Sequence, residues 1–363
     1  MNFVTIKEED FRKYAEKSPY KSFTQTPEIA KLRSKNGWTP YYFGVEDSGK
    51  LKAGAMIVAK PTFLGKSTYY CPGGPLLDYE DIKLTNFFFK NLKKYAKSHN
   101  GYVLHIDPYY ELVERTRDGE VKDGGFNHKQ AIKNLKNNGF KSIKSSMPKY
   151  LFVLELKGRA EEQLLTSMKR NTRNHIRKAE KMGVKVRELK REELNVFKRI
   201  TESTSSRRHF QDRPLEYYEN MYDLFHNKGE IQFLLAEAEV DGKTVPMSVA
   251  MFMLYGNEVI YLYSGSDEKY MKDYNAQYLI QWHMIKYAAK NEFKTYNFYG
   301  IQGLPDKMQK DYGIYDFKKG FTSDETGRVV ELIGAYETPI NQVFCYLHQT
   351  LSKAKQLNHR RKQ

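Results

Sequence analysis

Residues 42–73, YFGVEDSGKLKAGAMIVAKPTFLGKSTYYCPG, decide the fold, because the same order of elements returns at residues 233–265, FLLAEAEVDGKTVPMSVAMFMLYGNEVIYLYSG. Each stretch reads as a strand, a tight turn, an apolar second strand and a third strand that ends in tyrosine, a small residue and glycine or proline and glycine. The turn glycines Gly49 and Gly242 are 193 positions apart, and so are Tyr70 and Tyr263. This spacing predicts a duplicated structural unit.

Each repeat continues with a helix that has an aromatic and aliphatic face, and Lys94 and Lys286 near the two helix ends are 192 positions apart. An alternating strand follows each helix, at residues 102–107 and 295–300. A hairpin sheet with a crossover helix is a mixed α/β (α+β) unit. This order of elements resembles that of GNAT-type acyltransferase domains, so the sequence predicts two such domains in tandem.

The composition fits a globular protein of two domains. The chain has 363 residues, of which 40% are hydrophobic and 14% aromatic, too many large apolar groups for a disordered chain. Sixty Lys and Arg against 44 Asp and Glu give a formal net charge of +16. This excess favours polyanionic partners: nucleic acid, phosphorylated substrates or an anionic membrane surface.

The two cysteines, Cys71 and Cys345, lie in unrelated contexts, so we expect neither a disulfide framework nor a metal site. The N-terminus lacks a basic segment followed by an apolar one, and the longest apolar stretch, around residues 245–254, is about half as long as a membrane span needs. We therefore expect a cytoplasmic protein in a reducing compartment.

Several separated segments carry a resemblance to a known family: residues 25–33 with Trp38, the strand end at 106–108, the segment DRPLEY at 212–217, the strand at 261–263, and YDFKKGF at 315–321 flanked by 299–301 and 331–334. Together they make the chain similar to the FemABX family, the tRNA-dependent aminoacyltransferases that build peptidoglycan interpeptide bridges. The resemblance runs through nearly the whole chain.

The resemblance implies two GNAT-like domains with a cleft between them, the first from residues 1–149 and about 335–363, the second from 150–334. Some members carry a coiled-coil arm, but only about a dozen residues separate the helix of Tyr217 from the next strand, so this chain is similar to the compact members. The implied partners are aminoacyl-tRNA and UDP-MurNAc-pentapeptide or lipid II, whose stem peptide receives the amino acid at the amine of residue 3. No cofactor is implied, and we expect a monomer.

Three residues are candidates for catalysis. Asp107 ends a predicted central strand, where a carboxylate can accept the proton of the attacking amine; a cap before Pro108 is the alternative. The resemblance places Phe317 and Lys318 where the acyl group meets the acceptor, and an ammonium there can stabilise the oxyanion. We expect a strand at this position, so that Lys319 points to its opposite face. The alternatives to these catalytic roles are that Phe317 packs in the core and that Lys318 is a solvated surface lysine.

The acceptor candidates are basic and aromatic. Arg213 precedes Pro214 at a predicted helix start, and the resemblance implies that its planar fork contacts the nucleotide diphosphate. Arg33 occupies the other matching basic position, although Lys31 and Lys35 are close in sequence. Tyr261 and Tyr263 are two positions apart and are expected to share a strand face with Tyr217 nearby. Surface charges and ordinary buried tyrosines are the alternatives.

Residues 169–191 contain ten Lys or Arg and only two acids. Residues 167–181 predict a basic helix closed by Gly183, suited to phosphate contacts along tRNA through Lys169, Arg170, Arg173 and Arg177. A solvated helix face is the alternative. The tail at residues 353–362 is also basic, so it either contacts the inner membrane face or is disordered.

Two other functions remain. A CoA-dependent N-acyltransferase would share the fold but needs a glycine-rich phosphate loop, whereas residues 266–276 contain no glycine. The acidic residues that follow Gly73 and Gly74 also disfavour phosphate. A non-catalytic tRNA- or membrane-binding protein explains the charge but not the duplicated acyltransferase unit.

Overall fold

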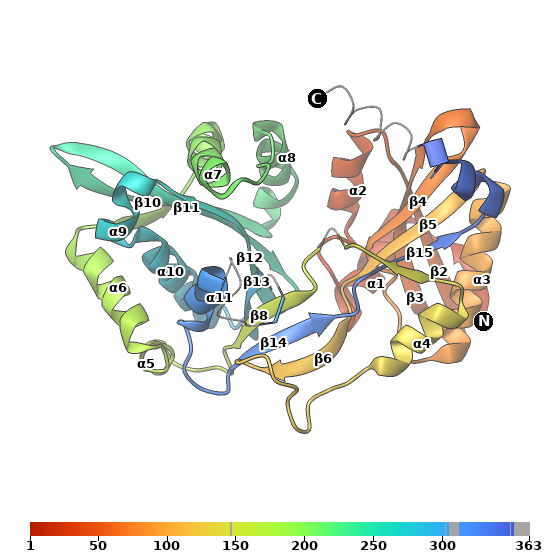
Figure 1. Cartoon of the computed structure of the whole chain (residues 1–363), viewed down its shortest axis with the longest axis horizontal. Coiled ribbons are helices and arrows are strands. Elements are labelled where there is room, and N and C mark those ends of the chain that lie inside the picture. Colours follow the sequence, from red (N-terminus) through yellow and green to blue (C-terminus); the bar gives the residue numbers. More distant parts are fainter. Residues whose placement is uncertain (146, 302, 305–311, 349, 352–363) are drawn as a thin grey trace. The chain divides into compact units, whose positions relative to one another are not determined.

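The computed structural model describes residues 1–145, 147–301, 303–304, 312–348 and 350–351 (Figure 1). It contains two separate β-sheets with helices on their faces. Its contacts divide the chain into unit 1, Met1–Leu112, Phe126–Met147 and Leu332–Gln363, and unit 2, Val113–Gly125 and Pro148–Glu331.

The sheet of unit 1 has seven strands, in which β4 and β5 are parallel and the other neighbouring strands are antiparallel. In spatial order the strands are β1 (Asn2–Thr5), β2 (Thr39–Asp47), β3 (Lys50–Pro61), β4 (Ser67–Gly73), β5 (Gly101–Pro108), β15 (Ala335–Pro339) and β7 (Lys141–Ile143). The strand that carries Asp107 therefore lies in the interior of the sheet.

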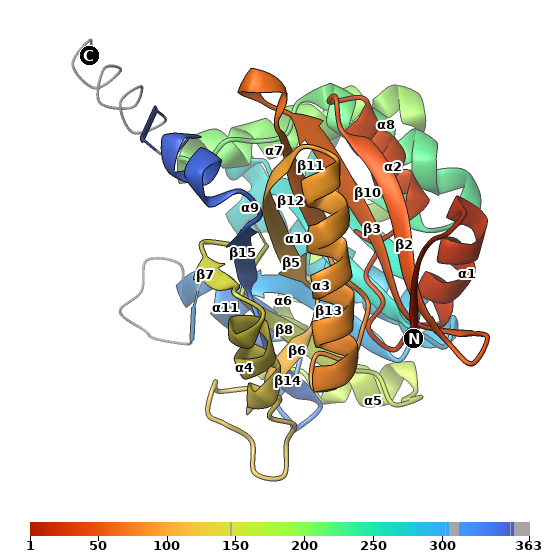
Figure 2. The same cartoon turned by 90° about the vertical axis from the view of Figure 1, so that its right-hand side faces the viewer.

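Helices cover both faces of this sheet. They are α1 (Glu8–Lys17), α2 (Pro27–Ser34), α3 (Ile82–Ser98) and α4 (Lys129–Asn137), with a short 3₁₀ turn at Phe63–Gly65. Phe43 of β2 packs on Tyr95 of α3 at 4.7 Å between ring centres, whereas the preceding Tyr42 packs on Phe11 of α1 at 5.2 Å. Because neighbouring strand residues point to opposite faces, α1 and α3 cover opposite sides. Figure 2 shows α3 lying across its face of the sheet.

The crossover helix α3 begins and packs as its sequence dictates. Asp81 caps the helix, since its carboxylate accepts a 2.9 Å hydrogen bond from the backbone N–H of Leu84. Leu84, Phe88 and Leu92 recur every four residues and are buried, which places one apolar stripe on the sheet. The helix thereby carries the chain from β4 to the parallel strand β5.

The sheet of unit 2 has eight strands, of which β12 and β13 form the parallel pair. In spatial order they are β6 (Glu111–Thr116), β14 (Gly327–Leu332), β8 (Tyr150–Glu155), β13 (Thr295–Ile301), β12 (Glu258–Ser266), β11 (Lys243–Tyr255), β10 (Ile231–Val240) and β9 (Lys185–Glu188).

The helices of unit 2 again cover both faces of the sheet. They are α5 (Glu161–Thr166), α6 (Arg170–Lys181), α7 (Leu194–Arg208), α8 (Leu215–Phe225), α9 (Glu268–Tyr274), α10 (Ala276–Lys290) and α11 (Tyr312–Lys319), with 3₁₀ turns at Arg191–Glu193 and His226–Lys228. Phe233 of β10 packs on Phe197 of α7 at 5.0 Å, whereas its neighbour Leu234 belongs to the core that includes Trp282 and Ile285 of α10.

The duplication predicted from the spacing of glycines and tyrosines is confirmed in the strand order. The strand order of unit 1, β1-β2-β3-β4-β5-β15-β7, corresponds strand by strand to the order β9-β10-β11-β12-β13-β8-β14 in unit 2. Each series contains two antiparallel hairpins, then a parallel pair joined by a crossover helix, and then an antiparallel neighbour. The helix pairs α1/α2 and α7/α8 also precede equivalent strands, β2 and β10. The fold is a tandem pair of GNAT-like units.

The units differ from the expected domains mainly at residues 113–125, and by two or three residues at 148–149 and 332–334. We expected residues 113–125 in the first domain, but their contacts are with unit 2, because β6 lies beside β14 in the second sheet. The C-terminal strand β15 pairs with β5 and β7 of the first sheet.

Between β9 and β10 the chain forms α7 and α8, of 15 and 11 residues, and two 3₁₀ turns. No coiled-coil arm is present in this fully described stretch, as predicted. Within the described ranges, no helix combines the length and apolarity required to cross a membrane. No cluster of three or more His, Cys, Asp or Glu that could hold a metal ion occurs in those ranges either.

Candidate active site and substrate contacts

A pocket of about 350 Å³ opens on the sheet of unit 1 and contains two of the predicted residues, Arg33 and Asp107. Strand alternation builds it, because Thr68 and Tyr70 of β4 and His105 and Asp107 of β5 are each two residues apart. The full lining is Arg33, Trp38, Thr68, Tyr70, His105, Ile106, Asp107, Ile143, Lys144 and Ala335. The mixture of cations, one carboxylate and aromatic rings suits a polar ligand with an anionic part.

Asp107 is buried, and one of its carboxylate oxygens accepts a 2.8 Å hydrogen bond from the Ser145 hydroxyl. Its backbone pairs with Pro72 inside the parallel β4/β5 ladder. Asp107 lies within a strand and so does not cap a helix, and a turn cap before Pro108 remains the alternative to a catalytic role. A buried carboxylate at a pocket wall remains a candidate proton acceptor.

Of the three neighbouring basic residues Lys31, Arg33 and Lys35, Arg33 is the one that lines this pocket. Its guanidinium lies 4.9 Å from the ring centre of Tyr70, and its Nε is buried with no hydrogen-bond partner among the described residues. Lys31 instead pairs with Glu8 at 3.6 Å. A buried, unsatisfied donor in a pocket is suited to an acceptor that a ligand supplies.

Sequence reasoning missed His105, which lines the same pocket. Its Nδ1 lies 3.5 Å from the Glu337 carboxylate of β15, and burial lowers the pKa of the imidazole in spite of that neighbour. The sequence offered a signal, because His105 stands two residues before Asp107 in an alternating strand and so shares its face.

In unit 2, three predicted acceptor residues form one cluster. Arg213 Nε donates a 3.3 Å hydrogen bond to the Tyr263 hydroxyl, and the guanidinium lies 5.3 Å from the ring centre of Tyr217. The rings of Tyr217 and Tyr263 pack edge to face at 5.9 Å. Burial raises the pKa of Tyr217 well above its ordinary value, so its hydroxyl stays neutral beside the Arg213 cation.

The remaining predicted acceptor residue, Tyr261, is not part of this cluster. Tyr263 stands opposite Met251 and Tyr261 opposite Phe252, so Leu262 is the extra residue of a β-bulge. The expectation of a shared face is therefore wrong. Tyr261 turns to the α10 side, where it packs on Phe252 and its hydroxyl accepts a 3.1 Å hydrogen bond from Gln277.

Asp212 fixes the segment that carries Arg213. Its side chain is 7% exposed and accepts hydrogen bonds from Lys198 at 2.9 Å, Thr201 at 2.9 Å and Tyr218 at 2.6 Å. Burial opposes the charge, but these bonds outweigh it and hold the pKa of Asp212 below its ordinary value. The carboxylate thereby ties α7 to α8 immediately before Arg213.

We expect Asp212→Asn to lower the free energy of unfolding by about 1 to 3 kcal/mol near neutral pH, because a buried charged acceptor is lost. A carboxylate whose pKa is lower in the folded chain than in the unfolded chain stabilises the folded state at pH values above its unfolded pKa. This stabilisation is lost as the pH falls through the folded pKa. The difference between variant and parent should therefore shrink on acidification in urea titrations. Asp223→Asn, which breaks an exposed pair with Arg191, should cost less than about 1 kcal/mol. Equal losses at both positions would contradict this assignment.

Lys318 lies in the helix α11, so the expected strand is wrong. Its side chain turns inward, is 6% exposed, and donates a 2.6 Å hydrogen bond from Nζ to the carbonyl oxygen of Gly300. The ammonium also lies 6.0 Å from the ring centre of Tyr261. Burial lowers the pKa of Lys318 to about 7, and no ion pair to it occurs within the described ranges. The alternative of a solvated lysine is wrong.

The neighbours of Lys318 point elsewhere, as successive helix residues must. Lys319 pairs with Asp118 and lies 5.4 Å from the ring centre of Tyr315. Phe317 is half-buried, and its ring packs on Tyr278 at 4.9 Å and on Phe321 at 5.3 Å. Phe317 thus takes part in core packing beside Lys318.

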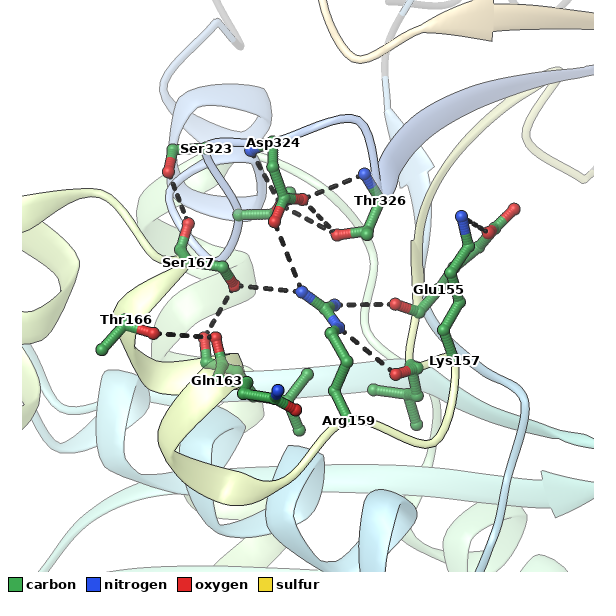
Figure 3. Close-up of polar contacts among 12 residues, drawn as sticks. Glu155, Lys157, Arg159, Gln163, Thr166, Ser167, Ser323, Asp324 and Thr326 are labelled. Atoms are coloured by element: carbon green, nitrogen blue, oxygen red, sulfur yellow. Dashed lines mark hydrogen bonds and ion pairs between the residues drawn. The ribbon is translucent and has the colours of Figure 1, made fainter.

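The start of α6 is bonded to the end of α11. The backbone N–H of Lys169 donates to the Gly320 carbonyl at 2.9 Å, and Lys169 Nζ lies 3.0 Å from the Asp316 carboxylate. Figure 3 shows the adjoining network, in which Arg159 donates to the Ser167 hydroxyl, the Asp324 carboxylate and the Glu155 carbonyl. The basic helix and the helix of Lys318 are therefore held together.

The predicted basic helix exists, although it begins at Arg170 rather than at Ser167, because the preceding residues close α5. Its four candidates are not equivalent. Arg173 donates to the carbonyl oxygens of Thr166 and Met168, and Lys169 is paired as described. Arg170 and Arg177 are exposed, so they are the better placed for an external phosphate.

The chain matches the FemAB family over residues 6–242 and 236–353. It belongs to the FemAB family. Aminoacyltransferase FemA of Staphylococcus aureus (strain MRSA252) is 26% identical over 422 aligned positions that cover 98% of this chain and 99% of FemA, and the protein of strain N315 gives the same values. The crystal structure of FemX shares the fold, with a TM-score of 0.81, 22% identity and coverage of 96% and 99%.

A tandem GNAT protein of the clavulanic acid biosynthesis pathway also shares the fold, at a TM-score of 0.53 and 10% identity, over 93% of this chain and 98% of its own. The alignment with FemA is longer than the 363 residues of this chain, so FemA carries segments without a counterpart here. The membership of the FemAB family and the FemA relatives make this chain an aminoacyltransferase, as the sequence predicted.

Proposed function

We propose that this chain moves an amino acid from aminoacyl-tRNA to the side-chain amine of residue 3 of a peptidoglycan stem peptide, carried by UDP-MurNAc-pentapeptide or lipid II. The observation that supports it most is Lys318, a buried amine with no paired carboxylate in the described ranges, in a chain of the FemAB family. A buried cation without a counter-ion is suited to negative charge that appears only during a reaction.

The proposed transfer passes through a tetrahedral intermediate. The acceptor amine attacks the ester carbonyl, the carbonyl oxygen becomes an oxyanion, and the collapse of this intermediate breaks the ester bond. The tRNA oxygen that leaves takes up the proton that the amine has lost and becomes a hydroxyl. Protonated Lys318 stabilises the oxyanion in this proposal, whereas Asp107 takes the proton that the amine loses. Phe317 packs beside Lys318 and limits the positions that its helix can take.

The acceptor contacts follow from charge and shape. The Arg213 guanidinium, already oriented by Tyr217 and Tyr263, offers a planar fork to a diphosphate. In unit 1, Arg33 offers its unsatisfied Nε to an anionic group of a ligand in its own pocket. A diphosphate occurs in both UDP-linked and undecaprenyl-linked acceptors, so these residues suit either. Tyr261 contacts Lys318 rather than the acceptor in this proposal.

The helix α6 is the proposed tRNA contact. Reversing the exposed charges by Arg170→Glu and Arg177→Glu should raise KM for aminoacyl-tRNA and flatten its dependence on salt, because fewer phosphate counterions are released on binding. The measurement is KM for the charged tRNA across a salt series. Lys133→Glu with Lys136→Glu on α4 changes the net charge equally and is the control. An unchanged salt slope in the α6 variant would mean that this helix is only a solvated face.

A CoA donor is the second candidate, and the connection from β12 to α10 disfavours it. This connection contains α9, and Asp267 at its N-terminus already accepts a hydrogen bond from the N–H of Lys269. A carboxylate there repels pyrophosphate and occupies an amide that would bind it. A non-catalytic tRNA- or membrane-binding role does not fit an aminoacyltransferase. Monomeric state and peripheral contact with the inner membrane face remain parts of the proposal.

Incubation of the protein with tRNAs charged with a labelled amino-acid mixture, and separately with acetyl-CoA, tests the donor. Each donor is offered with the UDP-linked and the lipid-linked acceptor, and the muropeptide product is weighed. We expect the mass of one amino-acid residue to be added, and only from tRNA. Transfer of acetyl from CoA, or no transfer from any charged tRNA, would contradict the proposal.

A further inference from the structure

The Lys318 ammonium depends on one backbone carbonyl for its position. Among the residues that the structure describes, the carbonyl oxygen of Gly300 is its single hydrogen-bond partner, at 2.6 Å, and the ring centre of Tyr261 lies 6.0 Å away. No carboxylate pairs with Lys318 in this part of the chain. An ammonium has three N–H donors, so fixing one of them on Gly300 determines where the other two point.

The strand that carries Gly300 is irregular just before this carbonyl. Asn297 and Gly300 of β13 pair with Val153 and Leu151 of β8, so two residues of β13 lie opposite a single residue of β8. This irregularity is a β-bulge, which bends its strand and redirects the residues that follow. The bulge thereby places the carbonyl of Gly300 where Lys318 of α11 donates to it.

Tyr299, inside this bulge, has a strained backbone. Its φ angle is +62°, in the left-handed region that glycine and asparagine adopt more readily than tyrosine. Gly300 beside it leaves no room for a side chain, since a Cβ there would lie 2.6 Å from the Cβ of Pro148. A strained residue of this kind persists only where its surroundings fix it, and such residues are concentrated at functional sites.

The side chain of Asn297 fixes the strained residue. It is fully buried, and its Oδ1 accepts a 2.7 Å hydrogen bond from the backbone N–H of Tyr299. Asparagine stabilises turns in this way, by bonding the backbone two residues further on. A continuous series of contacts therefore runs from Asn297 through the backbone of residues 299–300 to the ammonium of Lys318.

We propose that Asn297 is a positioning residue for the transfer reaction. It holds the backbone of Tyr299 in the left-handed conformation, so that the Gly300 carbonyl keeps the Lys318 ammonium directed at the oxyanion. Asn297 contacts neither the ester nor the amine in this mechanism. The inference rests on the proposed function, because Asn297 acts through Lys318.

Steady-state kinetics of Asn297→Ala tests the proposal. We expect kcat to fall about tenfold or more, because a small displacement of a catalytic group slows the reaction strongly, while KM for each substrate changes by about twofold or less. In a Lys318→Met background the same change should lower kcat no further, since residues that act as a unit are not additive. In a Tyr299→Gly background it should cost about twofold or less, because glycine adopts the left-handed conformation without support.

Asn134→Ala is the matched control for the loss of a buried asparagine. Asn134 is also fully buried, and its side chain donates to the carbonyl oxygens of Tyr79 and Glu80. This variant should be less stable but keep the kcat of the parent. Unfolding curves check that all variants are folded. Asn297→Ser is measured beside Asn297→Ala, because its hydroxyl accepts more weakly from the same N–H and the packing changes less. Its kcat should lie between those of the parent and of Asn297→Ala.

The outcomes separate this inference from the proposed function. A kcat that neither change of Asn297 lowers would overturn the inference and leave the role of Lys318 intact. So would a loss that is as large in the Lys318→Met or Tyr299→Gly background as in the parent. An unchanged kcat in Lys318→Met alone would contradict the proposed role of Lys318, and the inference with it.

Discussion

Replacement of Lys318 by Met lowers turnover by about a hundredfold or more, with substrate affinities nearly unchanged, if its ammonium stabilises the oxyanion. Met keeps most of the stem volume and removes the charge and the hydrogen bond to Gly300. The measurement is kcat with saturating aminoacyl-tRNA and acceptor. A mild loss of kcat, or a defect that saturating tRNA fully removes, would mean that Lys318 contributes to substrate binding and not to the chemical step.

Lys319→Met is the control, because the two lysines carry the same charge on neighbouring positions of α11. Lys319 pairs with Asp118, which is largely exposed, so its loss should cost less than about 1 kcal/mol of stability and little turnover. Equal losses of turnover in the two variants would point to general electrostatics rather than to a role specific to Lys318.

The stability of the Lys318→Met variant separates folding from catalysis. The folded chain binds a proton at Lys318 with a pKa of about 7, against an ordinary value of 10.5, so between these pH values the unfolded chain holds the additional proton. The parent therefore gains stability as the pH rises through this window. The variant lacks this dependence and should be at least as stable as the parent at about pH 7 in urea titrations. A destabilised variant would invalidate the kinetic comparison.

Replacement of Arg213 by Ala weakens binding of the UDP-linked acceptor by about 1.5 to 3 kcal/mol, the range for hydrogen bonds to a charged group. Isothermal titration with the nucleotide-linked peptide measures it. Tyr263→Phe removes only the hydroxyl that accepts from Arg213 and should have a smaller effect. An acceptor affinity that is unchanged by Arg213→Ala would mean that Arg213 does not contact the acceptor.

The tandem architecture was accessible from sequence because its determinants are local. Glycine turns and apolar alternation recur at nearly constant spacing, and strand order follows from them. The segment 312–319 was predicted wrongly for a definable reason. Tyr315 and Lys318 are its buried residues, three apart as on a helix, but the second is a lysine and conceals the helical period.

The faces of Tyr261 and Tyr263 could not be predicted, since a β-bulge depends on the partner strand β11 and reverses the alternation. The choice of Arg33 over Lys31 also required the structure, because it rests on the salt bridge to Glu8 from another helix. Asp212 was within reach of sequence reasoning, as an acid next to the candidate residue Arg213, but its partners lie on α7 and α8.

The most direct test of aminoacyl transfer locates the new bond. The protein is given one charged tRNA with a labelled amino acid and the UDP-linked acceptor, and the product peptide is fragmented in a mass spectrometer. We predict that the label is attached through an amide to the side-chain amine of residue 3. Label that remains on tRNA, or that is found at any other position of the acceptor, would contradict the account.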